Sequence, residues 1–329
     1  MLPRKHAVLY LIGGCLWVLT CSQNTASQSD TIRSAAADQG EEDMTPGQAV
    51  ILGVVEGLTE YLPVSSTGHL LMAERIMGIG DSTSSSLEIQ QRTKEASDAY
   101  TICIQLGAII AVLGLYFRRV KQMMRGLIGR DLAGSRLLLN VTAGFMPAAV
   151  IGLLFNRLIK AHLFGPWPVV IAWFVGGLAI LAVSWRNQKN SSQARSGMSL
   201  DNLTWRLALI IGFAQCIAMW PGVSRSLITI VGGLVVGLSM SAAVEYSFLL
   251  GMLTLGTATA YDALKHGQIM LQTFDPLSLG IGLVFAFVSA VVSMKWMVAY
   301  LNHHGLAIFG YYRVGLALIT ALLLATDIL

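Results

Sequence analysis

The chain has 329 residues, of which 54% are hydrophobic and only 12% are charged, and its formal net charge is +4. A soluble domain typically carries about 25% charged residues, so this composition, with a mean hydropathy of +0.64, excludes an ordinary soluble enzyme, and no nucleic-acid partner is expected. Repeated apolar runs of membrane-spanning length instead predict an all-α polytopic membrane protein.

The N-terminal segment is expected to be a targeting sequence. Arg4 and Lys5 precede a short apolar stretch, which is the layout of a secretory signal peptide, and we assign residues 1–21 to it. Residues 22–45 are polar and acidic and lack apolar periodicity, which predicts a disordered extension. The fate of this extension and the lipidation of Cys21 are left open by the sequence.

Residues 46–185 are predicted to form a first membrane repeat. It opens with two short apolar helices, at about 48–62 and 67–79, separated by a break at residues 63–66. Neither helix reaches the roughly 20 residues that cross a bilayer, so the pair is expected to be re-entrant. A polar loop and three spans follow, at about 82–97, 99–117, 137–158 and 167–185.

Residues 207–329 are predicted to form a second repeat of the same design, after a cytoplasmic loop at residues 186–206. Its broken pair is interrupted at Pro221-Gly222 and its three spans follow, so the segments are 207–219, 224–237, 243–262, 277–299 and 306–327. Because each repeat holds an odd number of spans, the second copy is upside down relative to the first. The expected fold is therefore an inverted-topology repeat of six transmembrane helices and two broken re-entrant pairs.

Basic segments set the expected orientation. Residues 118–136 hold six arginines and lysines against one acid, and residues 186–206 hold four against one. The positive-inside rule places both segments in the cytoplasm. Counting spans from there puts the N- and C-termini outside, with the first broken pair entering from outside and the second from the cytoplasm.

The two broken pairs also resemble each other in sequence. In one ungapped register Glu56 meets Gln215 and Ser65 meets Ser224. Charged and hydroxyl groups are costly to bury in an apolar segment, so function is their default explanation. Broken helices at matching positions of two halves point to a binding site near the membrane midplane.

Glu56 and Glu60 are four residues apart and share one helix face. Two carboxylates so close repel each other unless a proton, a cation or an arginine lies between them. The pair is therefore a candidate general base or a site for a divalent cation such as Mg²⁺ or Ca²⁺. The alternative is a structural pair that backbone donors or an arginine satisfy.

The second short helix opens with hydroxyls beside a histidine. Its first residues are Ser65, Ser66, Thr67, Gly68 and His69. Free N–H groups and the positive end of the helix dipole favour an anion there. A hydroxyl near an imidazole also suits a nucleophile and its base. The alternative is an ordinary helix cap.

The second repeat has polar residues and a glycine at the start of its own second short helix: Gly222, Ser224, Arg225, Ser226 and Thr229. Glycine lets the backbone approach a ligand closely, and an arginine at a helix start suits bidentate phosphate binding. These residues are candidate phosphate ligands. The alternatives are that Arg225 only neutralises a glutamate and that Thr229 only packs between helices.

These motifs resemble the bacterial undecaprenyl-diphosphate phosphatase family, also called the bacitracin-resistance protein family, over about residues 44–329. The resemblance rests on Glu56-x-x-x-Glu60, Pro63-Val-Ser-Ser-Thr-Gly-His69 and Pro221-Gly-Val-Ser-Arg-Ser226. It implies a phosphatase in the bacterial inner membrane, with its site facing the periplasm and supported by a divalent cation. The implied substrate is a polyprenyl diphosphate, whose hydrolysis to the monophosphate recycles the carrier lipid for peptidoglycan synthesis.

Carried over residue by residue, the resemblance makes Glu56, Glu60, Ser66, His69 and Arg225 the candidate catalytic residues. Three mechanisms stay open: attack by Ser66 with Glu60 or His69 as base, attack by His69, and attack by metal-bound water. The rival function is a transporter or flippase of a polyprenyl phosphate or another anion. The oligomeric state is left open, with a homodimer as one option.

Overall fold

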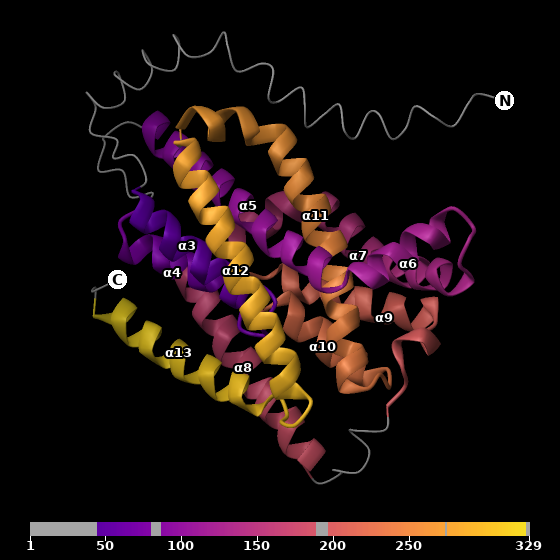
Figure 1. Cartoon of the computed structure of the whole chain (residues 1–329). Helices are drawn as coiled ribbons and strands as arrows, with labels where there is room; N and C mark the ends of the chain where they lie inside the picture. The colour runs from indigo at the N-terminus through magenta and orange to yellow at the C-terminus, as the bar shows by residue number, and fades with distance from the viewer. Residues whose placement is uncertain (1–44, 80–86, 189–196, 274, 327–329) are drawn as a thin grey trace, which may run out of the picture. The chain divides into compact units, whose positions relative to one another are not determined.

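Figure 1 shows the computed structural model of the chain, which describes residues 45–79, 87–188, 197–273 and 275–326. The predicted signal peptide and all but the last residue of the predicted extension lie outside these residues. In the described part, regular structure is helical, apart from an isolated bridge between Met198 and Leu238. This agrees with the all-α prediction.

The described helices follow the expected order of two broken pairs, each followed by long helices. The first half contains α3 Pro46–Thr59, α4 Ser66–Ile76, α5 Leu87–Leu115, α6 Phe117–Leu127, α7 Leu132–Leu163 and α8 Pro166–Gln188. The second half contains η2 Leu200–Asn202, α9 Trp205–Gln215, η3 Cys216–Met219, α10 Arg225–Val235, α11 Met240–Thr273, α12 Pro276–Leu301 and α13 Ala307–Ala325.

Each broken pair is built by local signals. Thr45 caps α3, since its side chain accepts a hydrogen bond from the Gln48 amide while the Gln48 side chain returns to the Thr45 amide. The helix then ends ahead of Pro63. In both pairs the residue before the second helix has a positive φ: 74° at Ser65 and 75° at Ser224. The two predicted breaks are confirmed, and they share one uncommon backbone conformation.

Among the described residues, four helices are long and apolar enough to cross a membrane, so the protein is a multi-pass membrane protein. They are Leu132–Phe155, Pro166–Trp185, Pro276–Leu301 and Ala307–Ala325. A fifth span exists if Tyr100–Leu115 and Phe117–Leu127, which are bent by 82°, are counted as one. The expected span at 243–262 lies in α11 but is not among these, because Glu245, Ser247 and several threonines dilute its apolar run.

Two segments outside the expected spans are partly helical. The predicted polar loop 82–97 is wrong from Leu87 onward, where α5 begins. Its glutamates, glutamines, arginine and lysine are good helix formers and extend the helix beyond its apolar part. The basic segment 118–136 is also largely helical, because α6 and the first turn of α7 occupy most of it.

The first helix of each broken pair crosses a long helix at a pair of glycines. A Cβ on Gly53 of α3 would clash with the backbone of Gly282 in α12, and a Cβ on Gly212 of α9 would clash with the backbone of Gly144 in α7. Without side chains the helix backbones approach closely, which is the usual packing in membranes. Gly53 and Gly212 are the residues that the sequence register pairs, so each broken pair docks in a matching way. Figure 1 shows α12 running across α3 and α5.

A single arginine ties the two breaks together. Arg313 of α13 is fully buried, and its guanidinium donates hydrogen bonds at 2.8–3.4 Å to the carbonyl oxygens of Pro63, Ala172, Trp173, Gly222 and Val223. The first of these belongs to the first break and the last two to the second. The missing side chain of Gly176 leaves room for the guanidinium.

We expect Arg313→Met to lower the apparent melting midpoint in detergent strongly, because it leaves these buried carbonyls without donors, at a cost on the order of 3–5 kcal/mol. Arg313→Lys should recover only part of the loss, since an ammonium has three donors and no planar fork. The exposed Lys295 of the neighbouring helix α12 provides the control, and Lys295→Met should change the midpoint little. Equal midpoints for the two methionine variants would contradict the assignment.

Candidate active site

Glu60 is the centre of the polar cluster. It lies just after the last residue of α3, is only 8% exposed, and accepts hydrogen bonds from two partners in different elements. Its Oε2 accepts a short hydrogen bond from the Ser66 hydroxyl, and its Oε1 pairs with Arg225 Nη2 at 3.0 Å. Three residues that the sequence singled out from two distant segments therefore meet, as the motif comparison predicted.

Arg225 is held by both halves of the chain. Its Nη1 donates to the Ser247 carbonyl oxygen of α11 at 3.2 Å, and its guanidinium carbon lies 5.4 Å from the centre of the Tyr61 ring. A Cβ on Gly251 would clash with the same guanidinium, so this glycine makes the space for it. Arg225 therefore neutralises Glu60, as one interpretation of the sequence expected, and it also lies within the polar cluster.

His69 lies one turn into α4, with both ring nitrogens engaged. Nδ1 lies 2.6 Å from the Ser65 carbonyl oxygen, which can only accept, so this nitrogen carries the proton. Nε2 then accepts from the Tyr312 hydroxyl at 2.7 Å, and the two rings stack at 5.7 Å. Neither nitrogen is left for Ser66, and the Ser66 hydroxyl donates to Glu60 instead.

Glu56 differs from Glu60 in having a buried carboxylate oxygen without a hydrogen-bond partner among the described residues. Glu56 is 1% exposed, and this oxygen is its Oε1. Both oxygens of Glu60 are occupied by Ser66 and Arg225. Within the described residues no cluster of three or more His, Cys, Asp or Glu side chains could hold a metal. A cation there would need further ligands beyond the protein carboxylates.

The N-termini of the two second helices differ. The Ser224 side chain caps α10 by accepting from the Leu227 amide, whereas Ser65 makes no side-chain cap on α4. The first turn of α4 also contains the exposed Thr67. The sequence treated the two helix ends as equivalent, but only the start of α4 lacks a serine cap. The amides near Ser66 are therefore the better anion site.

Most of the other candidate residues make structural contacts. Ser226 donates to the Leu62 carbonyl oxygen at 2.8 Å, and the Thr229 hydroxyl lies 2.6 Å from the Ser247 hydroxyl. Gly68 packs against Trp173, where a side chain would clash. Gly222 has a φ of +94° and accepts from Arg313. These residues hold the two breaks in place around Glu60.

Sequence reasoning missed Tyr312 and Arg313, which are adjacent in α13. An ionisable residue inside an apolar span is a signal in its own right, and Arg313 interrupts the apolar run 306–327. Tyr312 carries no comparable signal, because tyrosines are common at membrane interfaces. Only the fold places its hydroxyl on His69.

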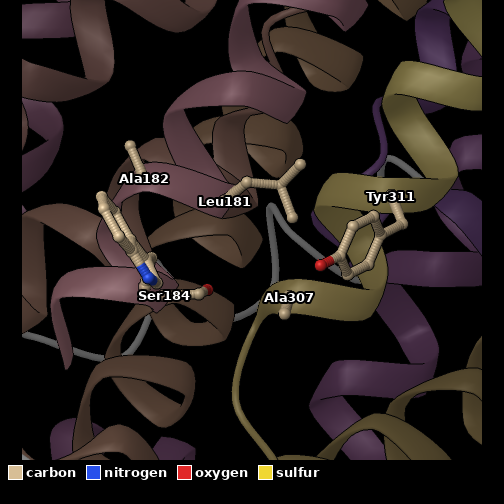
Figure 2. Close-up of a pocket in the computed structure, with 6 residues that line it drawn as sticks. Leu181, Ala182, Ser184, Ala307 and Tyr311 are labelled. Atoms are coloured by element: carbon tan, nitrogen blue, oxygen red, sulfur yellow. The ribbon is translucent and has the colours of Figure 1, made fainter. Parts of the chain in front are cut away.

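A recess of about 330 Å³ lies between α8 and α13 (Figure 2). It is lined by Leu181, Ala182, Ser184, Trp185, Ala307 and Tyr311. None of the candidate site residues lines it. The polar cluster is thus distinct from this recess, although Tyr311 is the neighbour of the Tyr312 that contacts His69.

The Tyr312 contact predicts a change in the imidazole of His69. In Tyr312→Phe the ring stays but the donor to Nε2 is lost, so the ¹⁵N resonance of Nε2 should move while Nδ1 keeps its proton. The signal is assigned by its absence in His69→Gln. Tyr311→Phe, one residue away and more exposed, is the control and should leave the resonance in place. An unmoved Nε2 resonance in Tyr312→Phe would show that the hydrogen bond does not form.

Comparison with known proteins identifies the family of the chain. The sequence profile described as Bacitracin resistance protein BacA matches residues 49–319. An undecaprenyl-diphosphatase from Sorangium cellulosum is 44% identical, over 82% of this chain and 83% of its own length. Relatives with the same activity in their names come from Nitrosomonas europaea (40% identical, 84% of this chain and 93% of the relative) and Rhodospirillum rubrum (42%, 83% and 92%). The chain therefore belongs to the bacitracin resistance protein BacA family.

Proposed function

We propose that this protein is a membrane phosphatase that hydrolyses undecaprenyl diphosphate to undecaprenyl phosphate and inorganic phosphate. The names of its relatives carry this activity. The observation that supports it best is the buried triad in which Glu60 accepts from Ser66 and pairs with Arg225. A nucleophile, a base and a phosphate-binding cation in one cluster are what phosphoryl transfer by a serine requires. The product re-enters peptidoglycan synthesis as carrier lipid, and its recycling counters bacitracin.

In the first step the Ser66 oxygen attacks the terminal phosphorus. Glu60 takes the hydroxyl proton, the bond from phosphorus to the bridging oxygen breaks, and undecaprenyl phosphate leaves with that oxygen and its electron pair. The short hydrogen bond between Ser66 and Glu60 places base and nucleophile together before the substrate arrives. Once Glu60 is protonated, Arg225 is free to bind the transferring phosphoryl group.

In the second step the phosphoserine is hydrolysed. Glu60, which has returned its proton to the leaving phosphate or to solvent, accepts a proton from water, and the water oxygen attacks the phosphorus. The bond to the Ser66 oxygen breaks, Glu60 passes the proton taken from water to this oxygen, and inorganic phosphate leaves.

Positive charge from two arginines supports the diphosphate. Arg225 lies in the cluster, and Arg313 donates only to backbone carbonyl oxygens in the bonds that the structure describes, so no carboxylate cancels its charge. The amides at the uncapped start of α4 add further donors. In this arrangement His69 orients the start of α4 through the Ser65 carbonyl oxygen.

A divalent cation, Mg²⁺ or Ca²⁺, is proposed to enter with the substrate. Oε1 of Glu56 would be its protein ligand, and phosphate oxygens of the substrate and water would supply further ligands, as is usual for Mg²⁺. Glu60 remains the second proposed ligand, and its two oxygens also accept from Ser66 and Arg225. When bound, the ion supplies charge neutralisation at the diphosphate.

We further propose the inverted arrangement of two repeats with six spans. The paired positive-φ serines and the paired crossings of Gly53 on Gly282 and Gly212 on Gly144 support it. With the basic segments on the cytoplasmic side of the inner membrane, the start of α4 opens to the periplasm and both termini lie outside. Reactivity of single cysteines at residues 67 and 206 toward an impermeant reagent distinguishes this orientation from its inverse.

The central test is to trap the covalent intermediate. Rapid quench of the purified protein with labelled polyprenyl diphosphate should give an acid-stable phosphoserine that is absent in Ser66→Ala. Glu60→Gln should lower kcat by at least about 10²-fold, because the base is lost. An acid-labile adduct would assign the attack to His69 instead, and no adduct in a rapid burst would assign it to water. Uptake of the lipid without phosphate release would favour the transporter.

Replacing Glu56 should change how turnover depends on the cation concentration. Glu56→Gln should raise the concentration of Mg²⁺ or Ca²⁺ that gives half-maximal turnover by about tenfold or more, because a neutral amide is a weaker ligand than a carboxylate. Turnover at saturating cation should recover in part. Gln215→Glu, at the matching position of the other repeat, is the control and should leave the cation dependence unchanged. A cation dependence that is the same in Glu56→Gln and wild type would remove Glu56 from the ion's ligands.

A further inference from the structure

The helix α6 has no part in the proposed reaction, yet its position and surface are unusual. It follows the apolar end of α5 after one residue and is bent from it by 82°. In the proposed six-span arrangement α5 crosses the membrane and ends at Leu115, so a helix at this angle to it would lie close to the plane of the bilayer surface. In Figure 1, α6 and the turn after it lie at the edge of the helical body.

One face of α6 is fixed to the protein. Met123 and Gly126 are buried, and the Ser135 hydroxyl of α7 donates to the Gly126 carbonyl oxygen at 2.9 Å. Arg119 points to the same side, where it pairs with Asp201 at 2.9 Å and with Glu245 at 2.8 Å. The helix is therefore held in one orientation about its axis.

A second face of α6 is basic. Arg118, Lys121 and Arg125 are all exposed, and their spacing of three and four residues puts them on one side of the helix. The helix Phe117–Leu127 contains no acidic residue. Arg119, the remaining basic residue of α6, is separate from this basic stripe because it is engaged in ion pairs.

A third face, beside the basic stripe, is apolar. Phe117, Met124 and Leu127 are 61%, 57% and 64% exposed, and at 3.6 residues per turn they lie on adjoining positions. Large apolar side chains beside cationic ones are the pattern of a helix that lies in the membrane interface. The apolar side chains enter the acyl boundary, and the cations reach the headgroups.

We propose that α6 is an interfacial helix whose Arg118, Lys121 and Arg125 bind anionic phospholipid headgroups at the bilayer surface. Charge complementarity decides the occupant, because three cations with no acid in the same helix favour an anionic surface over a neutral one. The bend supplies the geometry, since it brings the stripe to the surface where the span ends. The binding is independent of catalysis at Glu60.

The test compares lipid retention by the purified, full-length protein. Native mass spectrometry in equal mixtures of phosphatidylglycerol and phosphatidylcholine should show preferential retention of phosphatidylglycerol. A lysine or arginine near an anionic surface contributes roughly a fivefold preference. The triple variant Arg118→Gln/Lys121→Gln/Arg125→Gln should therefore lower that preference by at least about tenfold. Added salt should weaken the wild-type preference in the same direction.

A second triple variant removes the same net charge from elsewhere. Arg75, Arg206 and Lys295 are exposed and lie outside α6, and their replacement by Gln should leave the preference close to wild type. The melting midpoint of each variant checks that it folds. Both midpoints should stay close to wild type, because neither variant alters a buried contact of α6. An unchanged preference in the α6 variant, or an equal loss in both variants, would overturn the proposal.

Discussion

The guanidinium of Arg313 is the contact on which the rest of this structure depends. Two broken helix pairs from opposite halves of the chain must meet inside a membrane, where an unpaired backbone carbonyl is costly. Arg313 donates to Pro63 in one break and to Gly222 and Val223 in the other, so one side chain satisfies carbonyls that neither helix pair satisfies by itself. Its full burial among carbonyl oxygens also places a positive charge behind the site.

The chemistry of the site follows from that junction. With the breaks joined, Glu60 from the first meets Arg225 from the second, and the ion pair makes a buried carboxylate tolerable. The same carboxylate accepts from Ser66, so charge neutralisation and nucleophile activation share one group. In the proposed mechanism, substrate phosphate binds Arg225 as Glu60 becomes protonated. The resting and reactive states would then differ by one proton and one exchange of partners.

Much of this arrangement could be predicted from the sequence, for identifiable reasons. Proline and glycine at 63, 221 and 222 stop short apolar helices at matching positions, so both breaks were predictable. Polar residues at membrane depth marked Glu56, Glu60 and Arg225 as functional. The helix α6 within the basic segment 118–136 was not predicted, because basic residues signal a cytoplasmic segment but do not distinguish a loop from a helix.

The sequence by itself determined the membrane class, the two breaks and the residue types of the site, because hydropathy, proline and buried charge act locally. Only the tertiary structure decided which groups share a proton. It brought the Ser66 hydroxyl to Glu60 and His69 to Tyr312, and Oε1 of Glu56 has no hydrogen-bond partner among the described residues. Such pairings depend on how helices distant in the chain cross. Those crossings are set by close backbone contacts such as Gly53 against Gly282, which no local pattern encodes.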